Sequence, residues 1–175
     1  MATNLEQVQR YLVDLELTFN YREEEEDIIV FFSTEHFENI NGEKFLIVVI
    51  ECSDHGNLLQ IFSPQLYKVP QNSHKQALFE LLLMLLQDTY YVKFEYYDQR
   101  DEIRICIDVP LEDQDLSKEQ LRLCVYTLAN TIDQYHHIIS KTIETGIIQR
   151  EPSQVLMIKT LFDQIIEEYS EDILP

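Results

Sequence analysis

The sequence predicts an α+β fold in which helices pack on an antiparallel sheet. Two blocks of β-branched and aromatic runs carry short turns, and an apolar helical segment separates the two blocks. Strands joined by short turns pair antiparallel, whereas parallel strands need a long crossover. The expected order is therefore α-β-β-β-α-β-β-α-α, with the strands in two hairpin blocks. Three glycines, five prolines and no Ser-rich or Gly-rich stretch among 175 residues predict a single domain over residues 1–175.

The first part of the chain predicts one helix followed by three strands. Thr3 begins a capping-box pattern, and apolar residues then recur at helical spacing. The strands are expected at residues 28–32, 45–50 and 58–62, where β-branched and aromatic residues are concentrated. The acidic run at residues 23–27 is interpreted as a solvated turn that leads into the first strand, because blocks of like charge usually stay exposed.

A second helix and a second hairpin follow. Ser73 begins another capping box, and the apolar residues up to position 86 cover most of the helix circumference. This pattern predicts the most deeply buried helix of the chain. Strands at residues 92–96 and 103–109 alternate apolar and polar side chains around a turn at residues 98–101. The alternation predicts one buried face and one wetter face.

The longest periodic segment predicts a long helix after the second hairpin. Ser117 and Gln120 form a third capping box, and Gly146 suits the position just after the last turn. The apolar seam of this helix consists of Leu121, Val125, Leu128, Ile132, Tyr135 and Ile139. Pro152 then suits the first turn of an additional C-terminal helix over residues 152–170. The apolar stripe of that helix consists of Val155, Ile158, Phe162, Ile165, Ile166 and Tyr169.

Charge and hydropathy exclude several classes of partner. Thirteen basic residues against 32 acidic residues give a formal net charge of −19, which repels phosphate backbones and anionic lipids alike. No segment approaches the roughly 18 to 20 uninterrupted apolar residues of a membrane span, and the N-terminus lacks a signal-peptide pattern. Cys52, Cys106 and Cys124 are widely spaced within apolar runs, which predicts free thiols in a reducing compartment. We therefore expect a cytoplasmic protein without nucleic-acid or membrane partners.

The sequence contains no recognised pattern for nucleotide binding, nucleophilic hydrolysis or metal coordination. We therefore expect no catalytic site, no metal site and no cofactor. An alternative is a metal-assisted enzyme or sensor that uses acidic side chains with His36, which lies between two nearby glutamates, or with His55. His136 and His137 would allow proton sensing, although a solvated pair on a helix surface is the favoured interpretation.

Tyrosines provide the candidate contact surface for a protein partner. Aromatic side chains offer a large contact area with few rotamers to immobilise. Acidic residues flank the tyrosines of the second hairpin, whereas a nucleic-acid surface would carry interleaved Lys and Arg. The candidate partner-binding residues are Tyr91 and Tyr97 on this hairpin, with Tyr126, Tyr135 and Ile139 on the long helix.

The second hairpin and the start of the long helix carry a family resemblance. The strands at residues 92–96 and 103–111 lead through a short acidic linker to residues 116–121, which read L-S-x-E-Q-L. This arrangement resembles the YbjN family, described as sensory transduction regulators, whose fold is similar to that of type III secretion chaperones. The resemblance covers roughly residues 3–145, so the helix at residues 152–170 is additional. It implies a small, acidic, dimeric α+β protein that binds other proteins or peptides.

Three functional hypotheses follow. The leading one is a non-enzymatic cytoplasmic module that binds a protein or peptide client and has chaperone-like architecture. The second is the metal-assisted enzyme or sensor described above. The third is an assembly element in which the long apolar seam mediates self-association, for example into a homodimer. We favour packing of that seam on the domain's own sheet, because most globular helices bury their apolar stripe in this way.

Overall fold

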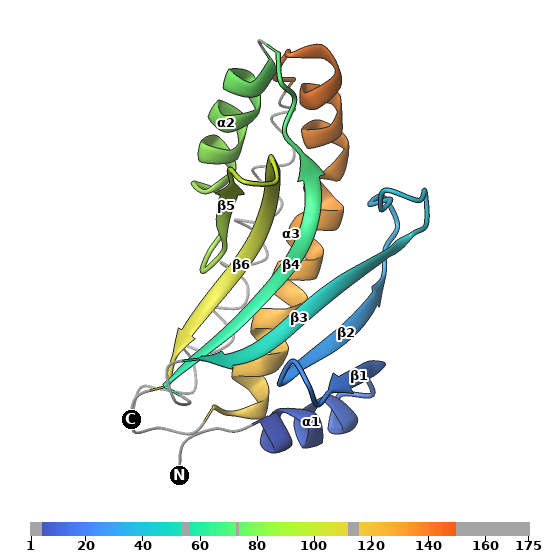
Figure 1. Ribbon diagram of the computed structural model, residues 1–175, viewed down its shortest axis with the longest axis vertical. Coiled ribbons are helices and arrows are strands. Elements are labelled where there is room, and N and C mark those ends of the chain that lie inside the picture. The colour runs from blue at the N-terminus through green and yellow to red at the C-terminus, as the bar shows by residue number, and fades with distance from the viewer. Residues whose placement is uncertain (1–4, 54–56, 73, 112–115, 150–175) are drawn as a thin grey trace, which may run out of the picture.

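The computed structural model describes residues 5–53, 57–72, 74–111 and 116–149. Within these ranges three helices cover one face of a six-stranded antiparallel sheet (Figure 1). The elements are α1 (Leu5–Asp14), β1 (Phe19–Arg22), β2 (Asp27–Ser33), β3 (Phe45–Ser53), β4 (Leu58–Lys68), α2 (His74–Leu85), β5 (Lys93–Tyr97), β6 (Glu102–Pro110) and α3 (Lys118–Thr145). The α+β class, the antiparallel sheet and the two strand blocks are confirmed. The predicted helix at residues 152–170 lies outside the described residues.

The two strand blocks form one continuous sheet in the order β1-β2-β3-β4-β6-β5. The blocks meet where β4 pairs with β6, with Ile61 opposite Ile107. The register of this pair shifts between Ser63 and Tyr67, and Gln65 within the shift has a left-handed backbone with φ of 52°. Such bulges bend a strand and increase its twist. The bend accompanies the change in direction of β4 toward α2 that is visible in Figure 1.

One strand of the sheet, β1, has no counterpart among the predicted elements. Its four residues, FNYR, are too few and too polar to give a periodic signal, and two of them are exposed. Residues 23–26, between β1 and β2, are all exposed acidic side chains, so the predicted solvated turn is confirmed for them. Asp27, the last residue of the same acidic run, is instead buried at the start of β2. Arg22 and Asp27 face each other across this turn and form an ion pair. The pair helps to hold β1 in register with β2.

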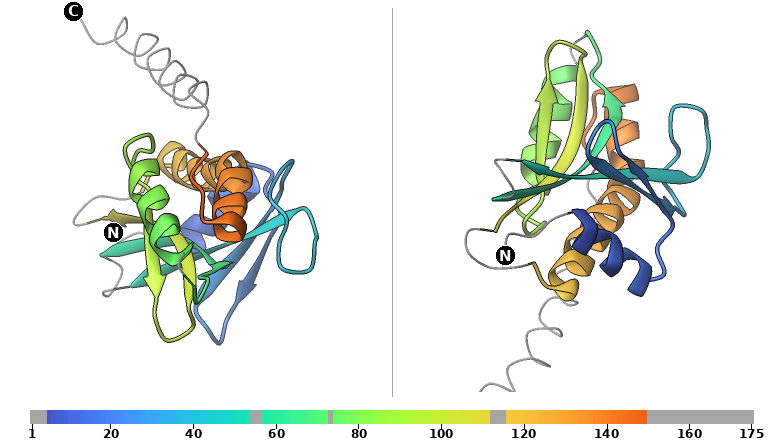
Figure 2. Two further views of the ribbon diagram at one scale, coloured as in Figure 1. Left: turned by 90° about the horizontal axis from the view of Figure 1, so that it is seen from above. Right: turned by 60° about the horizontal axis from the view of Figure 1, so that its bottom comes forward.

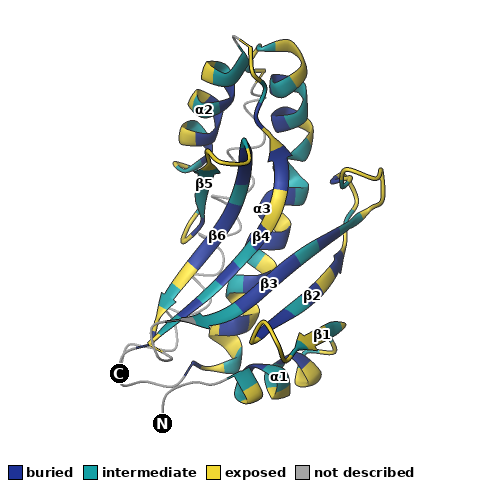
Figure 3. Cartoon of the chain, in the orientation of Figure 1, coloured by how far each residue is buried: buried dark blue, intermediate teal, exposed yellow. Residues whose placement is uncertain are grey.

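The core lies between the sheet and the helices. Alternate residues of β2, β3, β4 and β6 point toward α1 and α3 and are almost completely buried (Figure 3). The fully buried strand residues include Ile28, Ile50, Leu59, Ile61 and Ile105. Packing of this apolar layer against the helices supplies the main driving force for folding.

Helix α3 follows its predicted boundaries closely. The Ser117 hydroxyl accepts a hydrogen bond from the backbone N–H of Gln120, and the Gln120 side chain accepts one from the backbone of Ser117. Gly146 ends the helix in the left-handed conformation, with φ of 70°. Every residue of the apolar seam is at most 2% exposed. The seam therefore packs on the domain's own core, as favoured, and is not available for self-association.

Two candidate contact positions are corrected by this burial. Tyr135 is 2% exposed and Ile139 is 1% exposed, so neither side chain can touch a partner while the domain is folded.

The prediction that the second helix, α2, is the most deeply buried helix is wrong. This helix buries Leu78, Leu81, Leu82 and Leu85, but Leu83 on its outer side remains 67% exposed. No helix among the described residues is long and apolar enough to span a membrane.

Candidate functional site

The sheet face opposite the helices is the main candidate surface. Seen from the end and from below, α1, α2 and α3 all lie to one side of the sheet (Figure 2). In the described part of the chain no helix covers the other side, which we call the open face. Residues directly opposite each other in an antiparallel pair point to the same face of the sheet. The strand register therefore identifies the side chains of the open face.

An apolar strip crosses three strands of the open face. Ile29 of β2 lies opposite Val49 of β3, and Val49 lies opposite Phe62 of β4. Further along the same strands Phe31 lies opposite Ile47. The apolar strip is defined as Ile29, Phe31, Phe45, Ile47, Val49 and Phe62. Phe31 is 38% exposed, Val49 is buried by its neighbours, and the other four are half-buried. The strip is a continuous apolar surface without a covering layer from the described residues.

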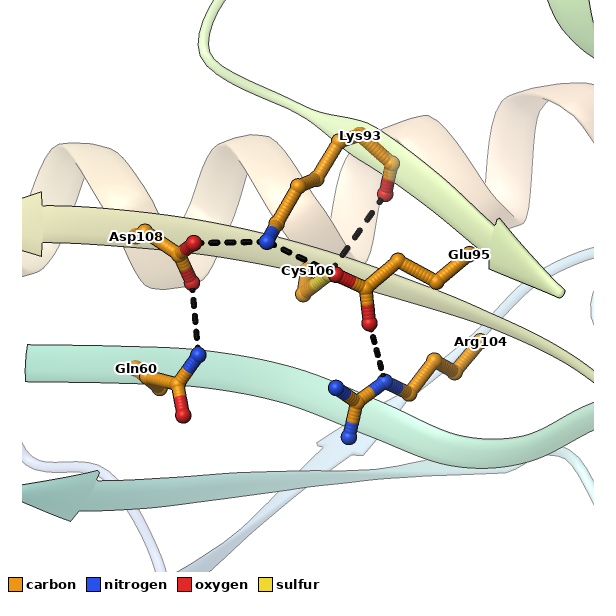
Figure 4. A network of polar contacts seen from close by, with 6 residues as sticks. All are labelled: Gln60, Lys93, Glu95, Arg104, Cys106 and Asp108. Atoms are coloured by element: carbon orange, nitrogen blue, oxygen red, sulfur yellow. Dashed lines mark hydrogen bonds and ion pairs between the residues drawn. The ribbon is translucent and has the colours of Figure 1, made fainter. Parts of the chain in front are cut away.

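A charged network adjoins the strip on β4, β5 and β6 (Figure 4). The ammonium group of Lys93 lies 2.6 Å from a carboxylate oxygen of Asp108 and 2.7 Å from one of Glu95. Arg104 donates from Nε to the other oxygen of Glu95, and Gln60 donates to Asp108 at 2.9 Å. The network thus ties three strands together through two basic and two acidic side chains. Its charges compensate one another within a chain that is strongly acidic.

The pKa values in this network favour its charged state. Burial opposes the charge on Lys93, but hydrogen bonds to Asp108 and Glu95 outweigh it and raise the pKa of the ammonium group. Burial likewise acts against ionisation of Glu95 and Asp108. Hydrogen bonds from Lys93 to both carboxylates, together with those from Arg104 to Glu95 and from Gln60 to Asp108, outweigh burial and lower both pKa values. Burial raises the pKa of the Cys106 thiol beneath them to about 12. The thiol therefore stays protonated at neutral pH and is a poor nucleophile.

Arg104 connects the network with the apolar strip. Its guanidinium carbon lies 5.1 Å from the centre of the Phe62 ring and 5.7 Å from the centre of the Tyr97 ring. Both distances are in the range of cation–π contacts. The arrangement places a fixed cation between two aromatic rings, next to a continuous apolar surface. Such a combination of aromatic rings and arginine is typical of protein-recognition surfaces.

The structure separates the five predicted contact residues. Tyr97 is 46% exposed at the end of β5 and borders the open face through its contact with Arg104. Tyr91 is 72% exposed in the connection before β5 and has a left-handed backbone. Tyr126 belongs to α3 and packs edge-on against Phe32, which lies on the helix side of the sheet. Tyr135 and Ile139 belong to the core. Of the five, Tyr97 alone adjoins the apolar strip.

The residues of the apolar strip were not among the predicted contact residues. Their signal was present, because the runs IIVFF at residues 28–32 and FLIVVI at residues 45–50 are apolar at consecutive positions. A strand that is apolar on both faces is usually covered on both faces, whereas a half-exposed strand alternates. The continuous runs therefore indicate that a second layer is expected over this face.

The histidines considered as candidates lie in two places. His36 is in the loop after β2, and His136 and His137 belong to α3. Asp133 of α3 accepts hydrogen bonds from the backbone N–H groups of Glu35, His36 and Phe37. Burial opposes its charge, but these three donors outweigh it and lower the pKa of Asp133. The contacts fix the loop after β2 to the helix layer. No group of three metal-ligating side chains occurs within the residues that the structure describes, and His55 lies outside them.

His136 lies between two aromatic rings. It stacks on Tyr67 with ring centres 5.8 Å apart and meets the edge of Phe37 at 5.1 Å. The Tyr67 hydroxyl lies 3.2 Å from Nδ1, and the Ser140 hydroxyl lies 3.4 Å from Nε2. Burial lowers the pKa of His136, in spite of nearby Glu38 and Asp133. His136 is therefore a packed, neutral part of the fold rather than the solvated surface residue expected.

Comparisons with known proteins agree with this geometry. Residues 4–139 match the sequence model of the YbjN family, described as "Putative bacterial sensory transduction regulator". No match was found among curated proteins. One similar solved structure is that of "YbjN, a putative transcription regulator from E. coli", with a TM-score of 0.57 and 15% sequence identity. The alignment covers 78% of this chain and 94% of that chain, and it shows a shared fold. Because the family model matches well over half of its residues, the chain belongs to the YbjN family.

Proposed function

We propose that the protein is a non-enzymatic regulatory module that binds another protein or peptide through the open face of its sheet. The observation that carries the proposal is the apolar strip, which extends over three strands and has no cover from the described residues. Contiguous exposed apolar surface on a soluble domain commonly marks an interaction site. The family description as a regulator supports a role in binding and gives no support for a particular reaction.

The chemistry of the surface suits a polypeptide partner. Phe31 and Phe62 provide aromatic anchors, and the compensated charges around Lys93 and Arg104 provide a polar border. Interfaces typically combine an apolar centre with such a border. The net charge of −19 disfavours nucleic acid and anionic membranes. We place the protein in the cytoplasm, where its three free cysteines would remain reduced.

The test uses paired substitutions on the open face. Phe31→Glu combined with Ile47→Lys leaves the net charge unchanged and removes two apolar side chains from the strip. Ile40→Lys is the control, since Ile40 is 86% exposed in the loop between β2 and β3. Partners are first captured from the native cytoplasm with the wild-type chain, and each is then purified and titrated calorimetrically against the three proteins. The double variant should lose at least about tenfold in affinity, or about 1.4 kcal/mol.

Two results would overturn the proposal. Unchanged affinity in a correctly folded double variant would show that the strip is not the binding surface. An equal loss of affinity with Ile40→Lys would show that the effect is not specific to the open face. Circular dichroism and thermal unfolding of each variant establish that the fold is retained before the titrations are compared.

A further inference from the structure

Two arginines of the described strands point to the open face of the sheet. Arg22 of β1 lies opposite Asp27, and Arg104 of β6 lies opposite Glu95. By strand register both side chains belong to the same face as the apolar strip. Their surroundings differ in how many of the three guanidinium nitrogens already have an acceptor.

All three nitrogens of Arg22 are used within the chain. Nε lies 2.7 Å from one carboxylate oxygen of Asp27, and a terminal nitrogen contacts the other oxygen. The second terminal nitrogen lies 3.7 Å from a carboxylate oxygen of Glu25. The guanidinium of Arg22 is therefore occupied in holding β1 against β2.

Arg104 uses only its Nε within the described part of the chain. Nε donates to Glu95, whose other carboxylate oxygen lies 2.7 Å from the ammonium group of Lys93. The two terminal nitrogens have no acceptor among the described residues, and in Figure 4 they point away from Glu95. Each of them carries two N–H groups. The side chain is 28% exposed, so an incoming group can reach these donors.

We propose that Arg104 anchors a carboxylate of the partner, and that the partner presents an Asp or Glu flanked by apolar side chains. The carboxylate accepts hydrogen bonds from the two terminal nitrogens, while the flanking side chains lie on the apolar strip. The inference rests on the proposed function, because it names the chemistry of the polypeptide bound at the same face. Two parallel N–H groups of arginine match the two oxygens of a carboxylate, and such pairs are stronger than neutral hydrogen bonds.

The surroundings of Arg104 hold the guanidinium in place before a partner arrives. The guanidinium carbon lies 5.1 Å from the centre of the Phe62 ring and 5.7 Å from that of Tyr97, while Glu95 fixes Nε. A side chain that is already ordered loses less conformational entropy on binding. Arginine and tyrosine are also enriched among the residues that contribute most to the affinity of protein interfaces. The arrangement therefore favours recognition at this position.

The open face tolerates an acidic segment, although the chain as a whole carries a charge of −19. The charged strand residues that the register places on this face are Arg22, Lys68, Lys93 and Arg104 with Asp27, Glu51, Glu95, Glu102 and Asp108. Four basic side chains against five acidic ones leave the strands of this face nearly neutral. Charges more than roughly 8 Å away are largely screened at physiological ionic strength, so acidic residues elsewhere repel the segment only weakly.

A selection with random peptides displayed on phage tests the chemistry of the partner. The peptides are selected against the full wild-type chain, and those that are enriched are synthesised and titrated calorimetrically. We expect an Asp or Glu between apolar residues to be their shared feature. Enriched peptides without a common acidic residue would overturn the inference, and so would an absence of enrichment.

A double-mutant cycle then locates the contact of the acidic residue. Wild type and Arg104→Gln are each titrated with a selected peptide and with the same peptide carrying the corresponding amide in place of its acid. Arg104→Gln should lower the affinity for the acidic peptide at least about tenfold and that for the amide peptide less than about twofold. Additive effects would show that the acid does not contact Arg104, since residues in contact normally show coupling.

Arg104→Lys and Arg22→Lys form a matched pair of variants. Both keep the positive charge on the open face and remove the planar guanidinium. Because the guanidinium of Arg22 is already occupied, only Arg104→Lys should lower the affinity for the acidic peptide, by a severalfold factor. Equal losses in the two variants would overturn the inference. Circular dichroism and thermal unfolding establish that each variant is folded before the affinities are compared.

The variant Phe31→Glu with Ile47→Lys separates this inference from the proposed function. Peptides that lose affinity for this variant but show no coupling to Arg104 would overturn the carboxylate anchor and leave the open face as the binding surface. Peptides that are affected by neither change bind elsewhere and would contradict both. Loss of affinity in this variant together with coupling to Arg104 supports both.

Discussion

Substitution of Gly146 by alanine probes how α2 and α3 are joined. Gly146 has φ of 70°, a conformation that costs an L-residue roughly 1–2 kcal/mol. An added Cβ would lie only 2.6 Å from Cδ2 of His74, so the imidazole ring must also move. That movement would weaken the 3.0 Å hydrogen bond between His74 and the carbonyl of Ile143, which contributes about 1 kcal/mol. The total expected loss of stability is about 2–3 kcal/mol.

Gly42→Ala provides the matched control. Gly42 has a similar φ of 76°, but an added Cβ would meet nothing within 4 Å. This substitution should therefore cost only the backbone strain, or roughly 1–2 kcal/mol. The difference between the two variants isolates the crowding at His74. In a background of His74→Ala, Gly146→Ala should cost no more than Gly42→Ala does, because the clash has been removed.

Urea unfolding followed by circular dichroism measures each free energy. For a chain of this size a loss of 2–3 kcal/mol corresponds to a fall in Tm of about 4–12 °C. Equal losses for Gly146→Ala and Gly42→Ala would refute the proposed crowding. A double-mutant cycle without coupling between His74 and Gly146 would refute it independently, since residues in contact normally show non-additive effects.

Three further predictions concern polar groups of α3. The Tyr135 hydroxyl is buried without a hydrogen-bond partner among the described residues, so Tyr135→Phe should stabilise the fold by roughly 1 kcal/mol in urea unfolding. Tyr126→Phe, at a 37% exposed position, should leave stability unchanged. Burial lowers the pKa of His136, so its contribution is complete above the unfolded value of about 6.5 and is lost as pH falls through the folded value. His136→Gln should therefore flatten the decline in stability below that pH, and an unchanged decline would contradict the assignment. Asp133→Asn should cost about 1 kcal/mol and speed amide exchange at residues 35–37, since the charged acceptor of three N–H groups is lost.

Much of the site escaped prediction because it depends on contacts between distant residues. Each partner in the charged network was visible as a polar residue in an alternating strand. The two basic and two acidic side chains meet through the β5–β6 hairpin, where Glu95 lies opposite Arg104. The pairing of β4 with β6 between distant parts of the chain then adds Gln60 opposite Asp108 and brings Phe62 next to Arg104. Tyr135 and Ile139 were proposed as contact residues on the long helix, and both also belong to its apolar seam. That same seam was buried in the core, and helical periodicity alone does not distinguish a partner's surface from the domain's own.

The sequence by itself determined the local structure of this protein. The capping box at Ser117, the left-handed glycine at position 146 and the exposed acidic turn before β2 all follow from interactions within a few residues. The patterning of strands and helices was sufficient for the fold class and the family. Tertiary structure alone decided which apolar face of β2 and β3 the helices α1 and α3 cover. Both faces of these strands are apolar, so the choice depends on where the helices are placed by chain connectivity and packing. The face that remained open is the one to which we assign the function.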